Sequence, residues 1–287
     1  MIRSLPRSRA YDRSFTLFIV LYFLFLFAPL LVTCVLAFNN SDFPSLPWRG
    51  LTLDWFFSEG PKRVGIFADG ENLRAIRTSF QTAVCVSILC VIVGVCAAFV
   101  FEQENFWGKE LLYFLMLAPL VIPGVILGIS LLLGANSVGV FFEDEFGLDL
   151  EIFRPSFWLV VFGQFSFITT FVTLVISARL RKFDRSLEEA ALNLGAGPFE
   201  VIVHVTLPYL RSSIIAAGAV SFLMSFENFN TTLFLVGSRP TLPINLYLQV
   251  RDGSTPVINA ISLLLIVGTF LLALVNFFYN YNKNQMV

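Results

Sequence analysis

Residues 186–208 read SLEEAALNLGAGPFEVIVHVTLP, and this mixed polar stretch lies between two long apolar runs. Ser186 followed by Glu189 has the spacing of a capping box, which predicts the start of a short helix. Gly195 predicts the left-handed residue that ends this helix, and Gly197-Pro198 predicts a turn with proline at the first position of a second helix. The stretch therefore predicts two short helices joined by a sharp turn, a shape suited to docking into a groove on another protein.

The sequence on both sides of this stretch is strongly apolar. Of 287 residues, 56% are apolar and 14% are charged, against about 45–50% and about 25% in ordinary soluble domains. Apolar stretches of about 20 residues are long enough to span a bilayer. Six are found: 14–38, 76–101, 110–134, 156–179, 210–236 and 257–281. The sequence therefore predicts an all-α, polytopic membrane protein with six transmembrane helices.

Positive charges beside the spans predict their orientation, because cytoplasmic flanks are enriched in Lys and Arg. Basic residues cluster before the first span and after the fourth: Arg3, Arg7, Arg9, Arg13, Arg181, Lys182 and Arg185. We therefore expect both termini and the 180–209 connection to be cytoplasmic, and the acidic 135–155 connection to lie outside. The 102–109 connection fits this orientation poorly, since two glutamates there outnumber one lysine.

Three parts of the chain are expected. Residues 1–75 form an amino-terminal tail, the first span and a periplasmic interfacial segment, residues 76–281 form a core of five spans, and residues 282–287 form a cytoplasmic tail. In the first part, Leu51–Phe57 with Trp55 predicts either an interfacial helix or an aromatic loop packed on the helix ends. Residues 237–256, rich in Gly, Pro and Ser, predict a loop.

The charge balance and the absence of catalytic motifs argue against several function classes. A net charge of −1 gives no basic surface for nucleic acid. The chain has no GxxxxGK[ST] phosphate loop, no HExxH or GxSxG pattern, and a single histidine, His204, so no catalytic residue or ATPase site is predicted. The four cysteines lie in apolar runs without a CxxC pair, which predicts buried side chains rather than a metal site.

Two features inside the spans indicate close packing and a polar pathway. Gly124 and Gly128 form a GxxxG pattern after two prolines, which predicts a kinked span that packs within the chain. Glu227 is the sole acid well inside the fifth span, and an intramembrane charge indicates a functional site. Amide and hydroxyl residues are expected to share its side of the helix, beside aromatic rings: Asn228, Asn230, Thr231, Phe222 and Phe226. A carboxylate with aromatic faces suits an organic cation, and the alternative is a structural carboxylate paired with a partner subunit.

Residues 189–208 resemble the EAA motif of ABC-importer permeases. Residues of the motif match at the correct spacing: Glu189, Ala190, Ala191, Gly195, Leu207 and Pro208. Val205 stands where the motif has isoleucine. The resemblance covers roughly residues 10–280 and implies the type I ABC-importer permease fold, located in the bacterial inner membrane.

The resemblance also implies a mechanism and partners. The helix before Gly195 resembles the coupling helix, which inserts into a cleft of a cytoplasmic ATPase dimer. There, Glu188 and Glu189 are expected to pair with basic residues of the ATPase, unless they are solvated charges favoured by the helix dipole. ATP and Mg would bind to the ATPase subunits, and this chain itself would bind no cofactor. A second permease subunit, a periplasmic binding protein and membrane lipid complete the implied partners.

The region 221–256 resembles spermidine/putrescine importer permeases. Thr241-Leu-Pro243 and the start of the last span, Pro256-Val-Ile-Asn-Ala260, match that group, whereas Asn228 replaces a second acid. This resemblance implies a polyamine substrate and a heterodimer of permeases rather than a homodimer. The alternatives are a permease for ferric iron, thiamine or an opine-like or amino-acid-like solute, or a carrier or channel that needs no ATPase.

Overall fold

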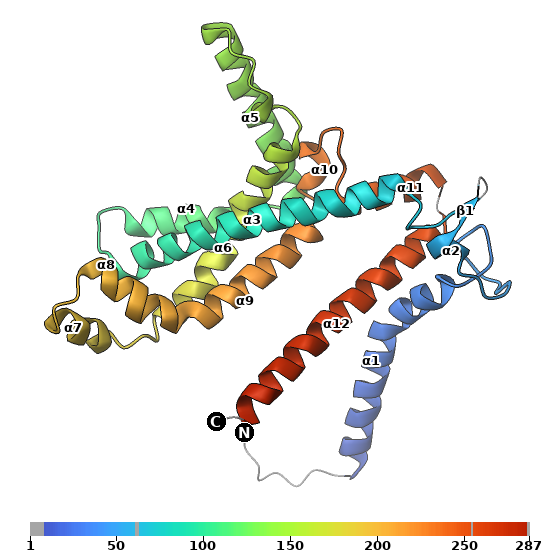
Figure 1. The fold of residues 1–287 in the computed structure, drawn as a ribbon, viewed down its shortest axis with the longest axis horizontal. Helices are drawn as coiled ribbons and strands as arrows, with labels where there is room; N and C mark the ends of the chain where they lie inside the picture. Colours follow the sequence, from blue (N-terminus) through green and yellow to red (C-terminus); the bar gives the residue numbers. More distant parts are fainter. Residues whose placement is uncertain (1–8, 61–62, 254, 286–287) are drawn as a thin grey trace. The chain divides into compact units, whose positions relative to one another are not determined.

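The computed structural model describes residues 9–60, 63–253 and 255–285, and these are mostly helical (Figure 1). The helices are α1 (Arg9–Leu36), α2 (Asp54–Phe57), α3 (Gly70–Gln103), α4 (Lys109–Val121), α5 (Gly124–Phe146), α6 (Phe157–Leu180), α7 (Ser186–Asn193), α8 (Pro198–Val201), α9 (Leu207–Phe226), α10 (Thr232–Leu235), α11 (Leu242–Gly253) and α12 (Val257–Gln285). Short elements add a β1–β2 hairpin (Glu59–Gly60 and Arg63–Val64), a 3-10 turn η1 (Glu151–Phe153) and a π-helical turn η2 (Ile202–Thr206). The all-α prediction is confirmed.

Five helices of the described residues are long and apolar enough to cross a membrane. They are Tyr11–Leu36, Gly70–Gln103, Gly124–Phe146, Phe157–Leu180 and Pro198–Phe226, and α12 adds a shorter apolar stretch, Val257–Leu271. Together they support the predicted six spans. Arg3 and Arg7 of the predicted amino-terminal tail and residues 286–287 of the predicted carboxyl-terminal tail lie outside the described residues, and residues 282–285 belong to α12.

The predicted bounds of the third span, 110–134, are wrong. α4 ends at Val121 and α5 begins at Gly124, with Ile122 extended between them at ψ 128°. A proline disfavours helical backbone in the residue before it, so Pro123 forces this break. α5 then continues to Phe146, so that much of the predicted 135–155 loop is helix and its acids Glu143–Glu145 form the last turn of α5.

The fifth span also differs from its prediction, 210–236, at both ends. The segment Pro198–Phe226 is one continuous apolar helix of 29 residues, so this helix begins twelve residues before the predicted start and runs through Pro208 without a break. Pro208 has no N–H to donate to a preceding carbonyl, and the wider π-helical turn η2 directly before α9 accommodates it. At the other end, α9 stops at Phe226 and the chain is irregular until α10 begins at Thr232.

The structure corrects one predicted connection and decides between two alternatives for another. The segment 237–256 is not a plain loop, because α11 occupies Leu242–Gly253 and its Leu242 N–H donates to the buried Ser79 hydroxyl at 2.8 Å. In the segment 51–57 only the single turn α2 is helical. Trp55 there is buried and its Nε1–H donates to the Asn39 carbonyl at 2.8 Å, which favours the packed aromatic loop over the interfacial helix.

Arg63 holds the loop between α1 and α3 together. Its guanidinium donates to Asp42 at 2.7 Å, Asn40 at 2.6 Å and Asp54 at 3.2 Å, and lies over the Trp55 ring. The Asp42 hydrogen bond raises the pKa of Arg63 above its usual value. Four residues from two segments of the loop, 40–42 and 54–55, therefore converge on one side chain.

The chain forms two compact units, and each is described by itself. The first consists of residues up to Leu73 together with those from Leu248, and in it α12 contacts α1 and α2. The second, residues 74–247, contains α4–α10, most of α3 and the first half of α11. The predicted functional boundaries at residues 75 and 281 stay predictions.

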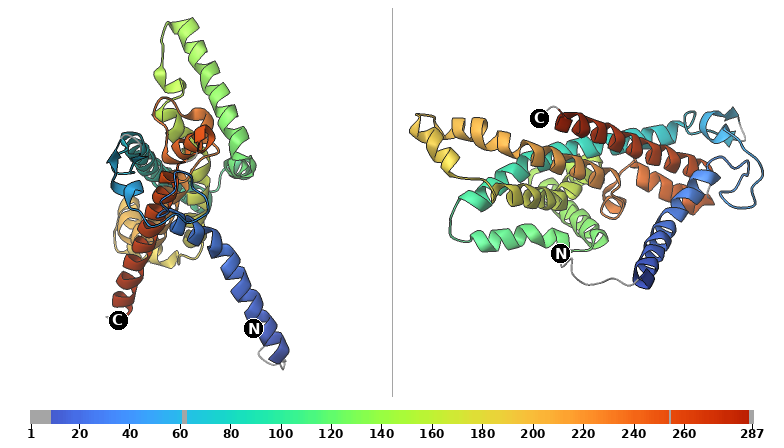
Figure 2. Two further views of the ribbon diagram at one scale, coloured as in Figure 1. Left: turned by 90° about the vertical axis from the view of Figure 1, so that its right-hand side faces the viewer. Right: turned by 90° about the horizontal axis from the view of Figure 1, so that it is seen from below.

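The core of the second unit is formed by α3, α6 and α9 (Figure 2). α6 lies along α9, and its middle is buried, with Ile168, Val172 and Ile176 inaccessible to solvent. Small residues allow this proximity, since a Cβ on Gly94 of α3 would lie 2.7 Å from the Val172 side chain. Close backbone approach through small residues is the usual basis of helix packing in membranes.

The GxxxG pair of α5 packs inside the chain, as predicted. A Cβ on Gly124 would lie 3.1 Å from the Asn230 Cβ, and a Cβ on Gly128 would lie 2.7 Å from the Thr231 carbonyl oxygen. The obstacle at Gly128 is backbone, which cannot move aside as a flexible side chain can. The pair therefore holds α5 against the segment that joins α9 to α10.

Replacing Gly128 by alanine should destabilise the protein. Overpacking of this kind costs about 1–3 kcal/mol, so we expect a lower melting temperature in detergent, read by fluorescence. Gly134→Ala is the matched control, because a Cβ at Gly134 of the same helix meets nothing within 4 Å. Equal melting temperatures for the two variants would contradict the packing described here.

Candidate functional site

The α7–α8 segment has the predicted shape of two short helices and a sharp turn. α7 ends beside Gly195, whose φ of +92° is left-handed, and Pro198 stands at the first position of α8. The Gly197 N–H donates to the Glu200 carboxylate at 2.9 Å and so fixes the start of α8. In Figure 1 this segment lies at the end of α9 that is remote from α10.

The start of α7 is built differently from the predicted capping box. Ser186 lies inside the helix rather than before it, and the Asp184 carboxylate accepts its backbone N–H at 3.0 Å. Hydrogen bonds from Ser186 also hold the pKa of Asp184 below its usual value. Asp184, and not Ser186, therefore accepts a backbone N–H at the start of α7, and the residue before the helix, Arg185, makes no side-chain cap.

The two glutamates of α7 have different surroundings, although both were predicted to pair with basic residues of an ATPase. Glu188 is half-buried, and its Oε1 accepts the Thr206 hydroxyl at 2.5 Å and the Gln103 amide at 3.3 Å. Glu189 is exposed, and its carboxylate has no partner among the residues that the structure describes. Only Glu189 is thus available to a basic group of another protein, and its pairing with an ATPase stays a prediction.

The other motif residues lie in α7, in the turn after it and at the start of α9. Ala190, Gly195 and Pro208 are exposed, while Ala191 and Leu207 are half-buried. The structure adds apolar side chains that sequence reasoning missed, since Leu194 is 89% exposed and Phe199 is 77% exposed on either side of the turn. The sequence feature that could have indicated these two exposed side chains is the presence of a large apolar residue on each side of a glycine-containing turn.

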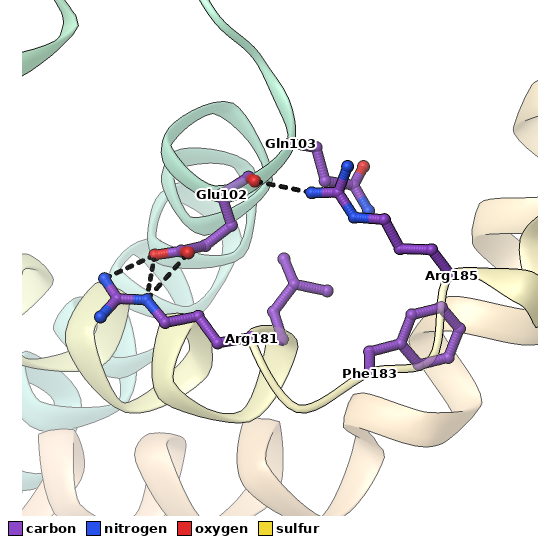
Figure 3. Close-up of a pocket in the computed structure, with 6 residues that line it drawn as sticks. Glu102, Gln103, Arg181, Phe183 and Arg185 are labelled. Carbon is purple, nitrogen blue, oxygen red and sulfur yellow. Dashed lines mark hydrogen bonds and ion pairs between the residues drawn. The ribbon is translucent and has the colours of Figure 1, made fainter.

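A cavity of about 200 Å³ lies beside α7, where α3 ends (Figure 3). It is lined by Glu102, Gln103, Leu180, Arg181, Phe183 and Arg185. Arg181 pairs with the Glu102 carboxylate through Nε at 2.9 Å and Nη2 at 2.8 Å, and this bond raises the pKa of Arg181. Arg185 donates to the Glu102 carbonyl at 2.9 Å. The charges of the cavity are therefore largely engaged with each other.

The second candidate site is the break between α9 and α10. The expectation that Glu227 shares a helical face with Asn230 and Thr231 is wrong, because helical spacing requires an unbroken helix and α9 ends at Phe226. Glu227 and Asn230 are exposed, Asn228 is half-buried and Thr231 is buried. The Glu227 carboxylate has no partner in the described part of the chain, and the role of these residues in a pathway stays a prediction.

Gln164 of α6 holds this break in place, and sequence reasoning did not single it out. Its side chain is inaccessible to solvent, its amide donates to the Thr232 hydroxyl at 2.8 Å, and it accepts the Ser225 hydroxyl. The Thr232 hydroxyl in turn donates to Asn228 Oδ1 at 2.9 Å. Because buried polar groups need partners, this network ties the end of α9 to the start of α10. The available signal was a glutamine within an apolar span.

Aromatic rings surround the end of α9. Phe222 stacks on Phe226 with centroids 6.0 Å apart and meets Phe80 of α3 edge-on at 5.6 Å. The ring centroids of Phe229 and Tyr247 lie 5.1 Å apart. The predicted Phe222 and Phe226 are thus brought together immediately before Glu227. No group of three or more His, Cys, Asp or Glu side chains in the described ranges could hold a metal ion.

The helical architecture and the α7–α8 segment define a class of membrane transport subunit, and comparison with known families agrees. Residues 90–281 match the family described as binding-protein-dependent transport system inner membrane component. The chain belongs to this family, and it is the multi-pass inner-membrane permease component of an ABC importer. By family it is a membrane subunit rather than an enzyme.

Two relatives and one solved structure are similar to this chain over most of its length. The putrescine transport system permease protein PotI of Escherichia coli (strain K12) is 33% identical over 250 residues, 86% of this chain and 84% of the relative. The spermidine/putrescine transport system permease protein PotC of the same strain is 26% identical over 251 residues, 87% of each chain. A crystal structure of a bacterial ABC transporter involved in import of the acidic polysaccharide alginate shares the fold, with a TM-score of 0.67 at 12% identity, covering 97% of this chain and 99% of that one.

Proposed function

We propose that this permease imports a small organic cation, a polyamine such as putrescine or spermidine, by ATP-driven alternating access. The observation that carries the proposal is the exposed Glu227 carboxylate, unpartnered in the described chain, at a helix break beside stacked aromatic rings. A carboxylate attracts an ammonium group, and the ring faces of Phe222 and Phe226 add cation–π attraction. The similarity to PotI and PotC supports the same substrate class.

The position of the break supports a place in the pathway. It packs against Gly128 of α5 and Gln164 of α6, which lie inside two membrane-length helices. Broken helices form binding sites in many transporters, because the chain there offers polar groups that a continuous helix does not. Asn230, exposed beside Glu227, is placed to contribute such a group.

The α7–α8 segment is proposed to dock on a cytoplasmic ATPase dimer, which binds ATP and Mg. Exposed Leu194 and Phe199 would enter an apolar cleft, and Glu189 would meet a basic residue at its edge. This orientation places both termini in the cytoplasm and the α9–α10 break toward the periplasm, where a binding protein would deliver the substrate. We propose a second, different permease chain as the partner across the membrane.

Uptake by the reconstituted importer tests this proposal. The permease, its ATPase, its partner permease and its binding protein would be placed in vesicles, and uptake of radiolabelled putrescine, spermidine, thiamine, ferric iron and an amino acid measured with ATP. We expect uptake of a polyamine that depends on ATP. Uptake of another of these solutes would overturn the substrate class, and uptake without ATP would indicate a carrier or channel.

A further inference from the structure

The half-buried Glu188 of α7 makes two hydrogen bonds to other helices of this chain. Its Oε1 accepts the Thr206 hydroxyl at 2.5 Å and the Gln103 amide at 3.3 Å. Thr206 is inaccessible to solvent, at the junction of η2 and α9, and Gln103 is the last residue of α3. One carboxylate oxygen therefore joins α7 to two membrane-spanning helices that are distant in sequence.

A second connection joins the start of α7 to the same end of α3 (Figure 3). Arg185, directly before α7, donates to the Glu102 carbonyl at 2.9 Å, and Arg181 binds the Glu102 carboxylate through two nitrogens. A cation at the carboxyl end of a helix is favoured by the helix dipole. α7 is thus attached to α3 at its beginning through Arg185 and in its first turn through Glu188.

The Thr206 contact leads to the other candidate site. η2 and α9 belong to the continuous helix that ends at Phe226, directly before Glu227. A displacement of α7 is therefore passed to the helix that carries the break, provided that the Glu188–Thr206 bond holds. The Glu188–Thr206 bond is charge-assisted, and such a bond is about twice as strong as a neutral one. This strength suits a contact that must hold while α7 moves.

We infer that Glu188 is a positioning residue for coupling: it fixes α7 to α9 and α3, so that movement of a docked ATPase becomes movement of the membrane helices. Glu188 and Glu189 then have separate tasks, the first directed into the permease and the second toward the ATPase. The inference rests on the proposed docking of α7, and it does not depend on which solute is carried.

The test compares variants in the reconstituted importer, with three readouts: retention of the ATPase subunit, ATP hydrolysis and solute transported per ATP. For Glu188→Ala and Thr206→Val we expect the ATPase subunit to be retained and hydrolysis to continue, with transport per ATP reduced about tenfold, the scale of one lost charge-assisted hydrogen bond. Thr206→Ser keeps the hydroxyl donor and should restore coupling. Asn193→Ala, an exposed change on the same helix, is the control for nonspecific effects.

Two outcomes would overturn the inference. Wild-type transport per ATP in Thr206→Val would show that the bond transmits nothing, and loss of the ATPase subunit in Glu188→Ala would show that this carboxylate acts in docking. Should Glu188→Ala fail to assemble, Thr206→Val and Thr206→Ser still decide the question, because the first replaces the hydroxyl by a methyl group of similar size and the second keeps the hydroxyl. Failure of the proposed function looks different, since the wild-type complex itself would then carry no polyamine or retain no ATPase subunit.

Discussion

Replacing Glu227 by glutamine is expected to reduce polyamine uptake by about tenfold or more, with the ATPase subunit still bound. The substitution preserves size and removes the charge at the α9–α10 break, where no described side chain neutralises it. A hydrogen bond to a charged group contributes about 1.5–3 kcal/mol, and each 1.4 kcal/mol is about tenfold in affinity. The loss of uptake should come chiefly from weaker binding of the polyamine, and basal ATP hydrolysis should change little.

Two control variants make this result interpretable. Glu227→Asp keeps the charge and should retain part of the uptake. Glu145→Gln removes another exposed acid, in the last turn of α5, and should leave uptake unchanged. Unchanged uptake by Glu227→Gln would remove Glu227 from the pathway, and a lower melting temperature of the whole complex with normal uptake would assign it to subunit pairing instead.

Replacing Gly195 by valine is expected to abolish association with the ATPase subunit. The φ of Gly195 is +92°, a region that costs an L-residue about 1–2 kcal/mol and a β-branched residue more. Steric overlap does not cause this cost, since a Cβ at Gly195 meets nothing within 4 Å. The backbone must therefore leave its left-handed conformation, which redirects Leu194 and Phe199 and removes the docking shape. Co-purification of the ATPase subunit measures the loss.

A neighbouring glycine offers the matched control. Gly197 lies in the same turn with φ −73° and ψ 158°, so Gly197→Ala needs no change of backbone and should keep the ATPase subunit. Gly195→Asn should retain more of it than Gly195→Val, because asparagine tolerates the left-handed region better than most residues. Normal co-purification with Gly195→Val would contradict the docking of this segment.

The α7–α8 turn was predictable because its determinants are local. Gly195 and Gly197-Pro198 restrict their own backbone, and the structure shows the turn that they imply. The inward direction of Glu188 was not predictable, since its partners Thr206 and Gln103 are 18 and 85 residues away. The contact of Asp184 with the Ser186 N–H was not predictable from the capping-box pattern, because Leu187 rather than a glutamate lies three residues after Asp184.

The spans show the same division between local and distant causes. Apolar composition locates membrane helices but averages over any interruption. Pro123 gave a local sign of the break in the third span, which the structure shows as a complete separation of α4 from α5. The break after Phe226 has neither glycine nor proline within residues 227–231, and Gln164 from another helix bonds to Ser225 and Thr232 on either side of it.

The absence of a break at Pro208 has a mechanical consequence. A helix of 29 residues from Pro198 to Phe226 is about 43 Å long at about 1.5 Å per residue. If one end of such a rod is held, a tilt of about 5° displaces the other by about 4 Å, by simple geometry at this length. To the extent that the helix moves as one unit, it acts as a lever arm, and a small tilt applied beside α8 moves its far end, directly before Glu227, by about the width of a side chain.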